Sequence, residues 1–238
     1  IIDLSYYSQN YFGKMYIKNK IFSNYYSQYI NGLSDILKSV GININTVPVL
    51  DVKRNKTHNI IGTRAFSSNP LIVNKLGKIC VESFMKNNIA TVIKHVPGHG
   101  LANLDSHHQT PIVRKYKNEL IAKDFLPFKN SKSLFAMTAH IIYTAYDPVN
   151  TATHSKFIID KVIRKKIKFK GILISDDISM KSLNYKIEEN ATKALKAGCN
   201  LVLHCNGKIS EMIKLSKVIP RIDKFTQKKT SHFYKFLR

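Results

Sequence analysis

Residues 94–108 carry side chains that could transfer protons or bind a metal. The stretch reads KHVPGHGLANLDSHH and holds four histidines and one aspartate. One proline and two glycines prevent it from forming a regular helix, so we expect a loop. Asp105 and His107 are two residues apart and project to the same side of an extended segment. The carboxylate can then accept a hydrogen bond from one imidazole nitrogen while the other nitrogen transfers a proton.

The elements that position this loop alternate between apolar runs and helical patterns. Two stretches, residues 23–41 and 69–88, show the spacing of apolar residues typical of helices, and Gly41 and Gly198 are placed to end helices. The apolar runs are rich in β-branched residues and nearly continuous, which favours strands buried on both faces of a parallel sheet. These runs are INTVPVL (44–50), NIATVIKH (88–95), LFAMTAH (134–140), GILISD (171–176) and NLVLHC (200–205).

Each apolar run closes with polar or ionisable residues. Such groups at the carboxyl ends of parallel strands are typical of a (β/α) barrel active site, or of the crevice in an open doubly wound sheet. The residues are Asp51, Lys94, His95, His140, Asp176, Asp177, His204 and Asn206. An alternative role is open for three of them. Asp177 could cap a helix that starts near ISMKSL, or accept hydrogen bonds next to it, and His140 and His204 could be core histidines bonded to backbone carbonyls.

Length and composition limit the class of protein. With 238 residues, of which 44% are hydrophobic, the chain can bury one substantial core. We predict a single domain over residues 1–218 and a basic tail over residues 219–238. No apolar run is long enough for a membrane helix, and the first residues lack a signal-peptide layout. Three cysteines without a CxxC pair fit a reducing compartment, so we expect a cytoplasmic protein, without a membrane partner.

The net charge of +23, from 38 Lys and Arg against 15 Asp and Glu, first suggests nucleic-acid binding. The lysines are scattered, however, and neither arginine clusters nor aromatic RNA-binding motifs accompany them. We therefore interpret the excess as solvated surface and do not expect nucleic acid as a partner.

Six segments, in order, carry a resemblance to a known family. They are GININTVPVLDV, IIGTRAFSSNP, KHVPGHG, LDSH, GILISDDISM and AGCNLVLHCN. The chain resembles the bacterial β-N-acetylglucosaminidases of glycoside hydrolase family three that work in peptidoglycan recycling. The resemblance implies a (β/α)8 TIM-type barrel and removal of terminal β-linked N-acetylglucosamine from anhydro-muropeptides. It implies no cofactor and no metal, and we expect a monomer with a small carbohydrate substrate.

The resemblance also assigns roles. A retaining glycosidase needs a carboxylate nucleophile and a proton donor at the leaving oxygen. Spacing alone leaves Asp176 and Asp177 equivalent, and the family pattern selects Asp176 as the nucleophile. His107 is then the acid/base with Asp105 as its partner. Three further residues would hold the sugar hydroxyls, with Asp51 orienting them: Arg64, Lys94 and His95.

Three alternatives stay open. His95, His99, His107 and His108 could form a zinc site, with Asp176 completing the ligand set. The chain could be a catalytically impaired barrel remnant that acts as a basic binding protein. It could also be a β-glucosidase of the same family, because selectivity for the N-acetyl group is not visible in single residues.

One departure from the family pattern bears on the fold. The family carries a DQEGG…R motif ahead of the GININ segment, and this sequence has no match to it. The chain opens at Ile1 without an initiator methionine. We therefore expect a barrel that lacks its first one or two strands.

Overall fold

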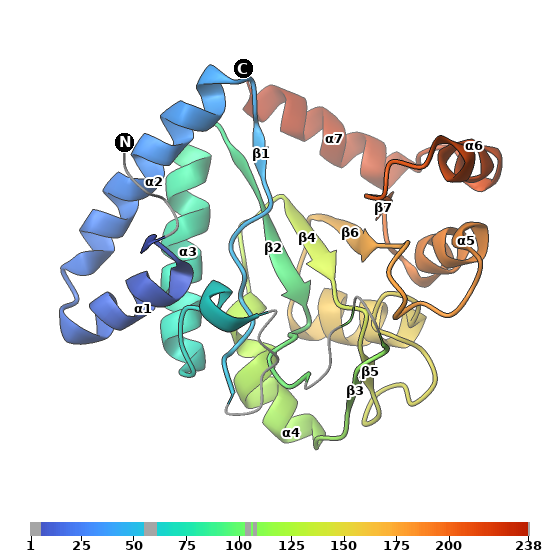
Figure 1. The fold of residues 1–238 in the computed structure, drawn as a ribbon, viewed down its shortest axis with the longest axis horizontal. Helices are drawn as coiled ribbons and strands as arrows, with labels where there is room; N and C mark the ends of the chain where they lie inside the picture. The colour runs from blue at the N-terminus through green and yellow to red at the C-terminus, as the bar shows by residue number, and fades with distance from the viewer. Residues whose placement is uncertain (1–5, 55–60, 103–105, 107–108, 238) are drawn as a thin grey trace.

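The computed structural model describes residues 6–54, 61–102, 106 and 109–237. Five strands form one parallel sheet in the order β1-β2-β4-β6-β7. They are β1 (Ile44–Asn45), β2 (Ala90–Val96), β4 (Phe135–Thr138), β6 (Ile172–Asp177) and β7 (Leu201–Leu203). All five predicted strands are confirmed, and each pairs with the next one predicted along the chain. The sheet curls around an open side (Figure 1), so what the structure contains is a half-barrel rather than a complete barrel.

Two short strands, β3 (Ile112–Val113) and β5 (Ile142–Tyr143), form a separate parallel pair. They lie beyond the carboxyl ends of β2 and β4, in the lower part of Figure 1. They belong to the connections that follow β2 and β4, and the sequence analysis did not predict them.

Helices and helical turns make up the rest of the described chain. The two predicted helices are confirmed as α2 (Phe22–Ser39) and α3 (Pro70–Lys86). Asn69 caps α3 by accepting a hydrogen bond from the Leu71 N–H, and Gly198 ends α5 in the left-handed conformation at φ 119°. The remaining elements are α1 (Gln9–Lys18), η2 (Gly62–Arg64), α4 (Lys117–Glu119), η3 (Leu120–Asp124), η4 (Leu126–Phe128), η5 (Ile158–Lys166), α5 (Ile187–Ala197), α6 (Ile209–Val218) and α7 (Lys224–Phe236).

The outer face of the sheet packs against α2, α3, the turns η3 and η4, and η5. Its strands contribute Ile93, Ala136 and Leu173, which are all fully buried. The helices and helical turns contribute large apolar side chains that cover them, among them Leu76, Phe84, Phe128 and Ile163. This layer is the main core, and it gives the strands their buried, β-branched character on this side.

The inner face of the half-barrel has its own apolar cluster. Because side chains alternate along a strand, Ala90 and Val92 of β2 face the same side as Phe135 and Met137 of β4 and Ile172 of β6. Helix α7 covers this cluster: the ring centroids of Phe233 and Phe135 lie 5.4 Å apart, in an edge-to-face arrangement. The segment that the sequence identifies only as a basic tail therefore contributes to the core of the inner face.

Helix α7 runs from the β7 side toward β1, past the amino ends of the strands (Figure 1). It begins at Asp223, whose side chain accepts from the Thr226 N–H at 2.6 Å. Buried Thr226 in turn accepts from the Asn200 side chain at 3.0 Å, which ties α7 to the start of β7. The opposite, carboxyl ends of the strands stay free of α7 and hold the polar residues described next.

Candidate active site

The carboxyl ends of β2 and β6 and the segment after β1 bring three ionisable side chains together. Nδ1 of His95 lies 2.7 Å from Oδ2 of Asp51, and Nε2 of His95 lies 3.9 Å from Oδ2 of Asp176. The first distance is a hydrogen bond, and the second is too long for one. His95 therefore stands between two carboxylates, bonded to one and facing the other.

Asp51 is fully buried and is held by three donors. Besides the imidazole, its Oδ1 accepts from the backbone N–H groups of His95, at 3.2 Å, and His99, at 2.6 Å. Burial on its own would raise the pKa of this carboxyl group, but His95 and His99 outweigh it and hold the pKa below its usual value. Asp51 is thus a buried anion that fixes the His95 ring and its tautomer, in the orienting role that the sequence suggested.

Asp176 lies near the end of β6 on the inner face, one strand period beyond Ile174. Its Oδ1 accepts from the Asp177 N–H at 2.8 Å. Burial on its own would raise the pKa of this carboxyl group. The nearby His95 and His140, the Asp177 N–H and Lys94 have a larger, opposite effect, so the pKa lies below its usual value. An ionised carboxylate whose side chain is 20% exposed is suited to nucleophilic attack.

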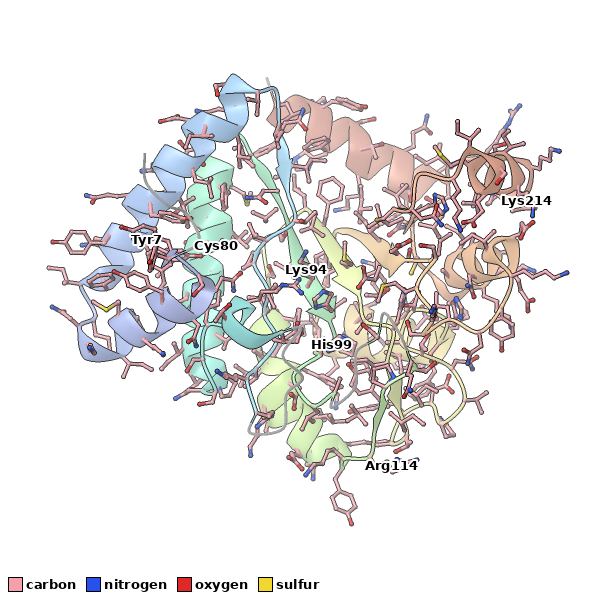
Figure 2. The ribbon with its side chains drawn as sticks, viewed as in Figure 1. Tyr7, Cys80, Lys94, His99, Arg114 and Lys214 are labelled. Carbon is pink, nitrogen blue, oxygen red and sulfur yellow. The ribbon has the colours of Figure 1, made fainter. Side chains whose placement is uncertain are left out.

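Lys94 precedes His95 and lies on the inner face of β2, near Asp176 and Arg64. Burial and the neighbouring Arg64 cation lower the pKa of its ammonium group, while Asp176 and Asp51 raise it. Figure 2 labels Lys94, which lies in β2, and His99, which lies in the loop that follows β2. Arg64 and Lys94 line one cavity of about 270 Å³ beside the segment that follows β1. Two of the predicted sugar-binding residues therefore share a cavity, and the third, His95, adjoins Lys94 in the chain.

The loop after β2 packs tightly onto its surroundings. Gly98 has φ 142°, a conformation that favours glycine, and a Cβ there would lie 2.8 Å from the carbonyl oxygen of Asp124. A Cβ at Gly100 would meet the carbonyl oxygen of Val52. The hydroxyl of Tyr143 donates to the Gly98 carbonyl oxygen. Close backbone packing therefore requires glycine at both positions.

His99 points into the same loop and is buried. Its Nε2 lies 3.2 Å from Oγ of Ser106, and its Nδ1 has no hydrogen-bond partner among the residues that the structure describes. Burial, followed by the nearby His95, lowers the pKa of the His99 imidazole to about 4. His99 is therefore neutral at physiological pH. The predicted acid/base pair, Asp105 and His107, lies outside the described residues.

The zinc alternative has no support within the described residues. Among residues 6–54, 61–102, 106 and 109–237, no group of three or more His, Cys, Asp or Glu side chains is arranged to hold a metal ion. His107 and His108, two of the proposed ligands, lie outside these ranges.

The remaining strand-end residues have structural partners. Nε2 of His140 donates to the carbonyl oxygen of Asp177 at 3.0 Å, and its Nδ1 contacts Oγ1 of Thr153 at 2.7 Å. Burial lowers the pKa of His140, so it is a neutral core histidine. Asp177 caps no helix, since the next one begins at Ile187. Its carboxylate instead accepts from the N–H and hydroxyl of Ser179 and from the Cys205 N–H.

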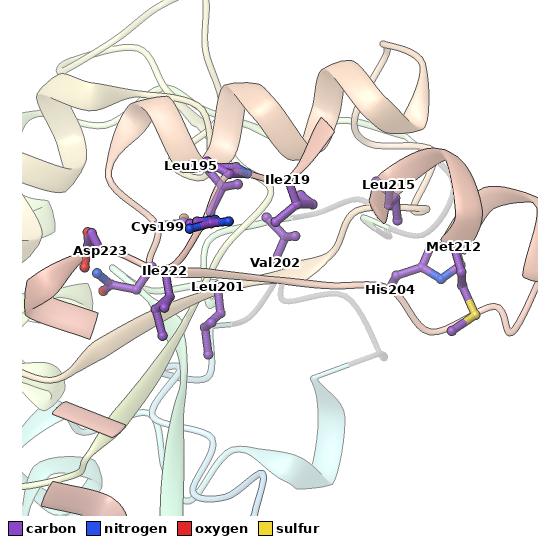
Figure 3. Close-up of a pocket in the computed structure, with 13 residues that line it drawn as sticks. Leu195, Cys199, Leu201, Val202, His204, Met212, Leu215, Ile219, Ile222 and Asp223 are labelled. Atoms are coloured by element: carbon purple, nitrogen blue, oxygen red, sulfur yellow. The ribbon is translucent and has the colours of Figure 1, made fainter. Parts of the chain in front are cut away.

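His204 lines a larger cavity between α5, β7, α6 and residues 219–223 (Figure 3). Its Nε2 lies 2.9 Å from Oε2 of Glu211. The cavity measures about 490 Å³, and Asp176 is not among the described residues that line it. Its lining is mainly apolar and includes Leu195, Leu201, Val202, Met212, Leu215, Ile219 and Ile222.

Arg54 and Asp124 form a buried pair that the sequence analysis missed. Nη2 of Arg54 lies 2.8 Å from Oδ2 of Asp124, which is completely buried beneath Gly98. Burial raises the pKa of Asp124 to about 6, although Arg54 opposes the shift. The pair joins the segment after Asp51 to the turn η3. The two residues are 70 positions apart, and no sequence motif predicts their pairing.

None of the helices in the described part of the chain has the length and apolar character needed to cross a membrane.

Comparison with known sequences adds family information to this geometry. Residues 31–231 match the Glycosyl hydrolase family 3 N terminal domain. A Beta-hexosaminidase of Idiomarina loihiensis is 35% identical over 188 residues, which cover 77% of this chain and 56% of that protein. A Beta-hexosaminidase of Hydrogenovibrio crunogenus is 37% identical over 187 residues, which cover 76% of this chain and 52% of that protein. The chain spans about half the length of these curated relatives.

Solved structures show the same fold. NagZ from Neisseria gonorrhoeae, in complex with N-trifluoroacetyl-D-glucosamine, matches with a TM-score of 0.85 at 27% identity, over 95% of this chain and 66% of that chain. A glycoside hydrolase family 3 β-N-acetylglucosaminidase from Paenibacillus sp. matches with a TM-score of 0.79 at 25% identity, over 90% of this chain and 43% of that chain.

Proposed function

Because this chain belongs to glycosyl hydrolase family 3, we propose that it carries the catalytic face of a retaining β-N-acetylhexosaminidase. The substrate proposed is a peptidoglycan-derived muropeptide with a terminal, non-reducing β-linked N-acetylglucosamine. The half-barrel is proposed as the larger part of a (β/α)8 barrel, and the protein as a cytoplasmic monomer. The names of the curated relatives and the sugar analogue bound by the NagZ neighbour support this choice of sugar.

The single observation that carries the proposal is the environment of Asp176. An ionised carboxylate ends β6 on the inner face, beside the His95–Asp51 pair and the cavity that Arg64 and Lys94 share. A retaining glycosidase needs such an anion below the anomeric carbon and hydrogen-bond donors around the sugar hydroxyls.

In the proposed mechanism, Asp176 attacks the anomeric carbon while His107, assisted by Asp105, protonates the leaving oxygen. The carbon–oxygen bond to the leaving group breaks, and a glycosyl ester to Asp176 forms. His107 then removes a proton from water, and the water releases the sugar from Asp176. Arg64, Lys94 and His95 bind the sugar hydroxyls throughout.

The test is hydrolysis of paired aryl glycosides by the purified chain. An aryl β-N-acetylglucosaminide should be hydrolysed faster than the matching aryl β-glucoside. Preference for the glucoside would favour a β-glucosidase of the same family. If a folded chain hydrolysed neither compound, the glycosidase proposal would fail, and a barrel remnant with a binding role would take its place.

A further inference from the structure

The segment that leads to Asp51 forms an edge of the parallel sheet. The Leu50 N–H donates to the carbonyl oxygen of Lys94 at 2.7 Å, and the Lys94 N–H donates to that of Pro48 at 3.1 Å. Val49 and Lys94 thus form an isolated parallel bridge. Because backbone groups point to opposite sides at successive residues of a strand, the N–H and C=O of Val49 face away from β2.

The side chain of Gln9 satisfies both of these outward-facing groups. Its Nε2 donates to the carbonyl oxygen of Val49 at 2.8 Å, and its Oε1 accepts from the Val49 N–H at 2.9 Å. One primary amide therefore supplies the donor and the acceptor that a neighbouring strand would otherwise supply. Asn and Gln offer a donor and an acceptor side by side on one planar group at every physiological pH, and Gln has the longer reach.

Gln9 is itself held in place. It is the first residue of α1, and Ser8 caps this helix by accepting from the Tyr11 N–H at 3.2 Å. A Cβ on Gly13 of the same helix would meet the backbone of Phe66, so α1 lies directly against the chain beyond Arg64. The amide is presented to Val49 by a packed helix rather than by a mobile surface residue.

We propose that Gln9 is a positioning residue for the active site, acting through Val49 on Asp51 and Lys94. Asp51 follows Val49 by two residues and orients His95, and Lys94 is the bridge partner of Val49. The inference rests on the proposed function for its catalytic consequence. Its structural part, that one amide fixes this edge, is independent of it.

Two substitutions at Gln9 test the contributions of its donor and its acceptor. Gln9→Met keeps the length of the side chain and removes both hydrogen bonds. Gln9→Glu keeps an acceptor for the Val49 N–H and, when ionised, places a carboxylate against the Val49 carbonyl oxygen. The matched control is Gln28→Glu, which makes the same change at an exposed position of the neighbouring helix α2.

The first readout is turnover of an aryl β-N-acetylglucosaminide under conditions where urea titration shows each variant fully folded. The value of kcat/KM should fall about tenfold or more in Gln9→Met, since small displacements at an active site have large kinetic effects. Gln28→Glu should match the parent. Unchanged turnover in both Gln9 variants would overturn the proposal.

The pH dependence of turnover by Gln9→Glu distinguishes an effect of lost hydrogen bonds from an effect of side-chain size. Protonation gives the introduced carboxyl group the donor that it lacks. Its rate relative to the parent should therefore rise as the pH falls toward the ordinary pKa of a glutamic acid, about 4.3. The cations Arg64 and Lys94 line the same cavity as Gln9 and favour the ionised form, so the rise should begin only below about pH 5. If the ratio of the Gln9→Glu rate to the parent rate did not change with pH, the hydrogen bonds of the Gln9 amide would not be what positions the site.

Amide hydrogen exchange decides the structural part without any activity. The Val49 amide should lose protection against exchange in Gln9→Met. The Leu50 and Lys94 amides should also lose protection, because they donate the two hydrogen bonds of the bridge. Loss at Val49 alone would show a local bond with no positioning effect. If the parent chain has no turnover above Asp176→Ala, the proposed function fails, and exchange at Leu50 and Lys94 still decides the role of Gln9.

Discussion

The carboxylate of Asp51 accepts a 2.7 Å hydrogen bond from Nδ1 of His95, and the other nitrogen of that ring faces Asp176 across 3.9 Å. Asp51 follows the first strand of the sheet, His95 ends the second and Asp176 ends the fourth. The curl of the half-barrel brings these strand ends together. The His95 ring, between Asp51 and Asp176, is the centre of the candidate site.

Asp51→Asn should lower kcat by about 100-fold and destabilise the fold by about 2 kcal/mol. The amide cannot serve as the anionic acceptor for Nδ1, so the imidazole loses its fixed tautomer. Steady-state kinetics and urea unfolding of the same preparations would measure the two effects. A variant with parent kinetics would show that the His95 ring needs no anchor.

The stability contributed by Asp51 should depend on pH. Its pKa is lower in the folded protein than in the unfolded chain. The contribution is therefore complete above the unfolded pKa, near 3.9, and is lost as the pH falls through the folded pKa. Unfolding free energies below about pH 4 should fall more steeply for the parent than for Asp51→Asn.

The stability contributed by Asp124 should depend on pH in the opposite direction. Its folded pKa of about 6 lies above the unfolded value, so its contribution is complete below the unfolded pKa and is lost as the pH rises through about 6. Relative to Asp124→Asn, the parent should lose stability between about pH 4 and about pH 6. Urea titrations across this range would measure the difference. If the two proteins kept a constant difference, Asp124 would be ionised throughout.

Phe233→Ala should destabilise the protein by about 3 kcal/mol, because the ring is buried against Phe135 on the inner face of the sheet. The matched control is Tyr234→Ala in the same helix, where the side chain is 65% exposed. Chemical denaturation would separate the two. Equal, small losses would mean that α7 contributes little to the core.

His107→Ala should reduce turnover most for substrates with poor leaving groups. Good leaving groups depart without protonation, so the loss of the proposed acid costs them least. The measurement is a series of aryl glycosides with leaving groups of graded acidity. A uniform loss across the series would assign the role of acid to another residue.

The sequence predicts the central strands β2 and β4 well because nearly all of their residues are buried, which leaves a nearly uninterrupted apolar run for each. It also predicts the polar strand ends, since carboxyl ends of parallel strands share one edge. Asp51, Lys94, His95 and Asp176 lie together as expected, although their roles stay proposals.

Other features depend on contacts between distant segments that leave no local pattern. The Arg54–Asp124 pair and the Gln9–Val49 bonds join residues 70 and 40 positions apart. Helix α7 was missed because its lysines conceal the few apolar residues that reach the sheet. Asp177 was predicted to cap a helix or to act as an acceptor; no helix begins there, and its carboxylate accepts hydrogen bonds from the turn at Ser179.

The identity of the nucleophile is the claim on which the mechanism depends. The measurement is hydrolysis of an aryl β-N-acetylglucosaminide by the parent, by Asp176→Ala and by Asp177→Ala, with and without added azide. We expect that Asp176→Ala loses turnover by about 10⁴-fold or more and that azide restores release of the aryl group, because the small anion fills the place of the carboxylate. We expect Asp177→Ala to keep measurable turnover and to show no rescue. Parent-like turnover by Asp176→Ala would contradict the account.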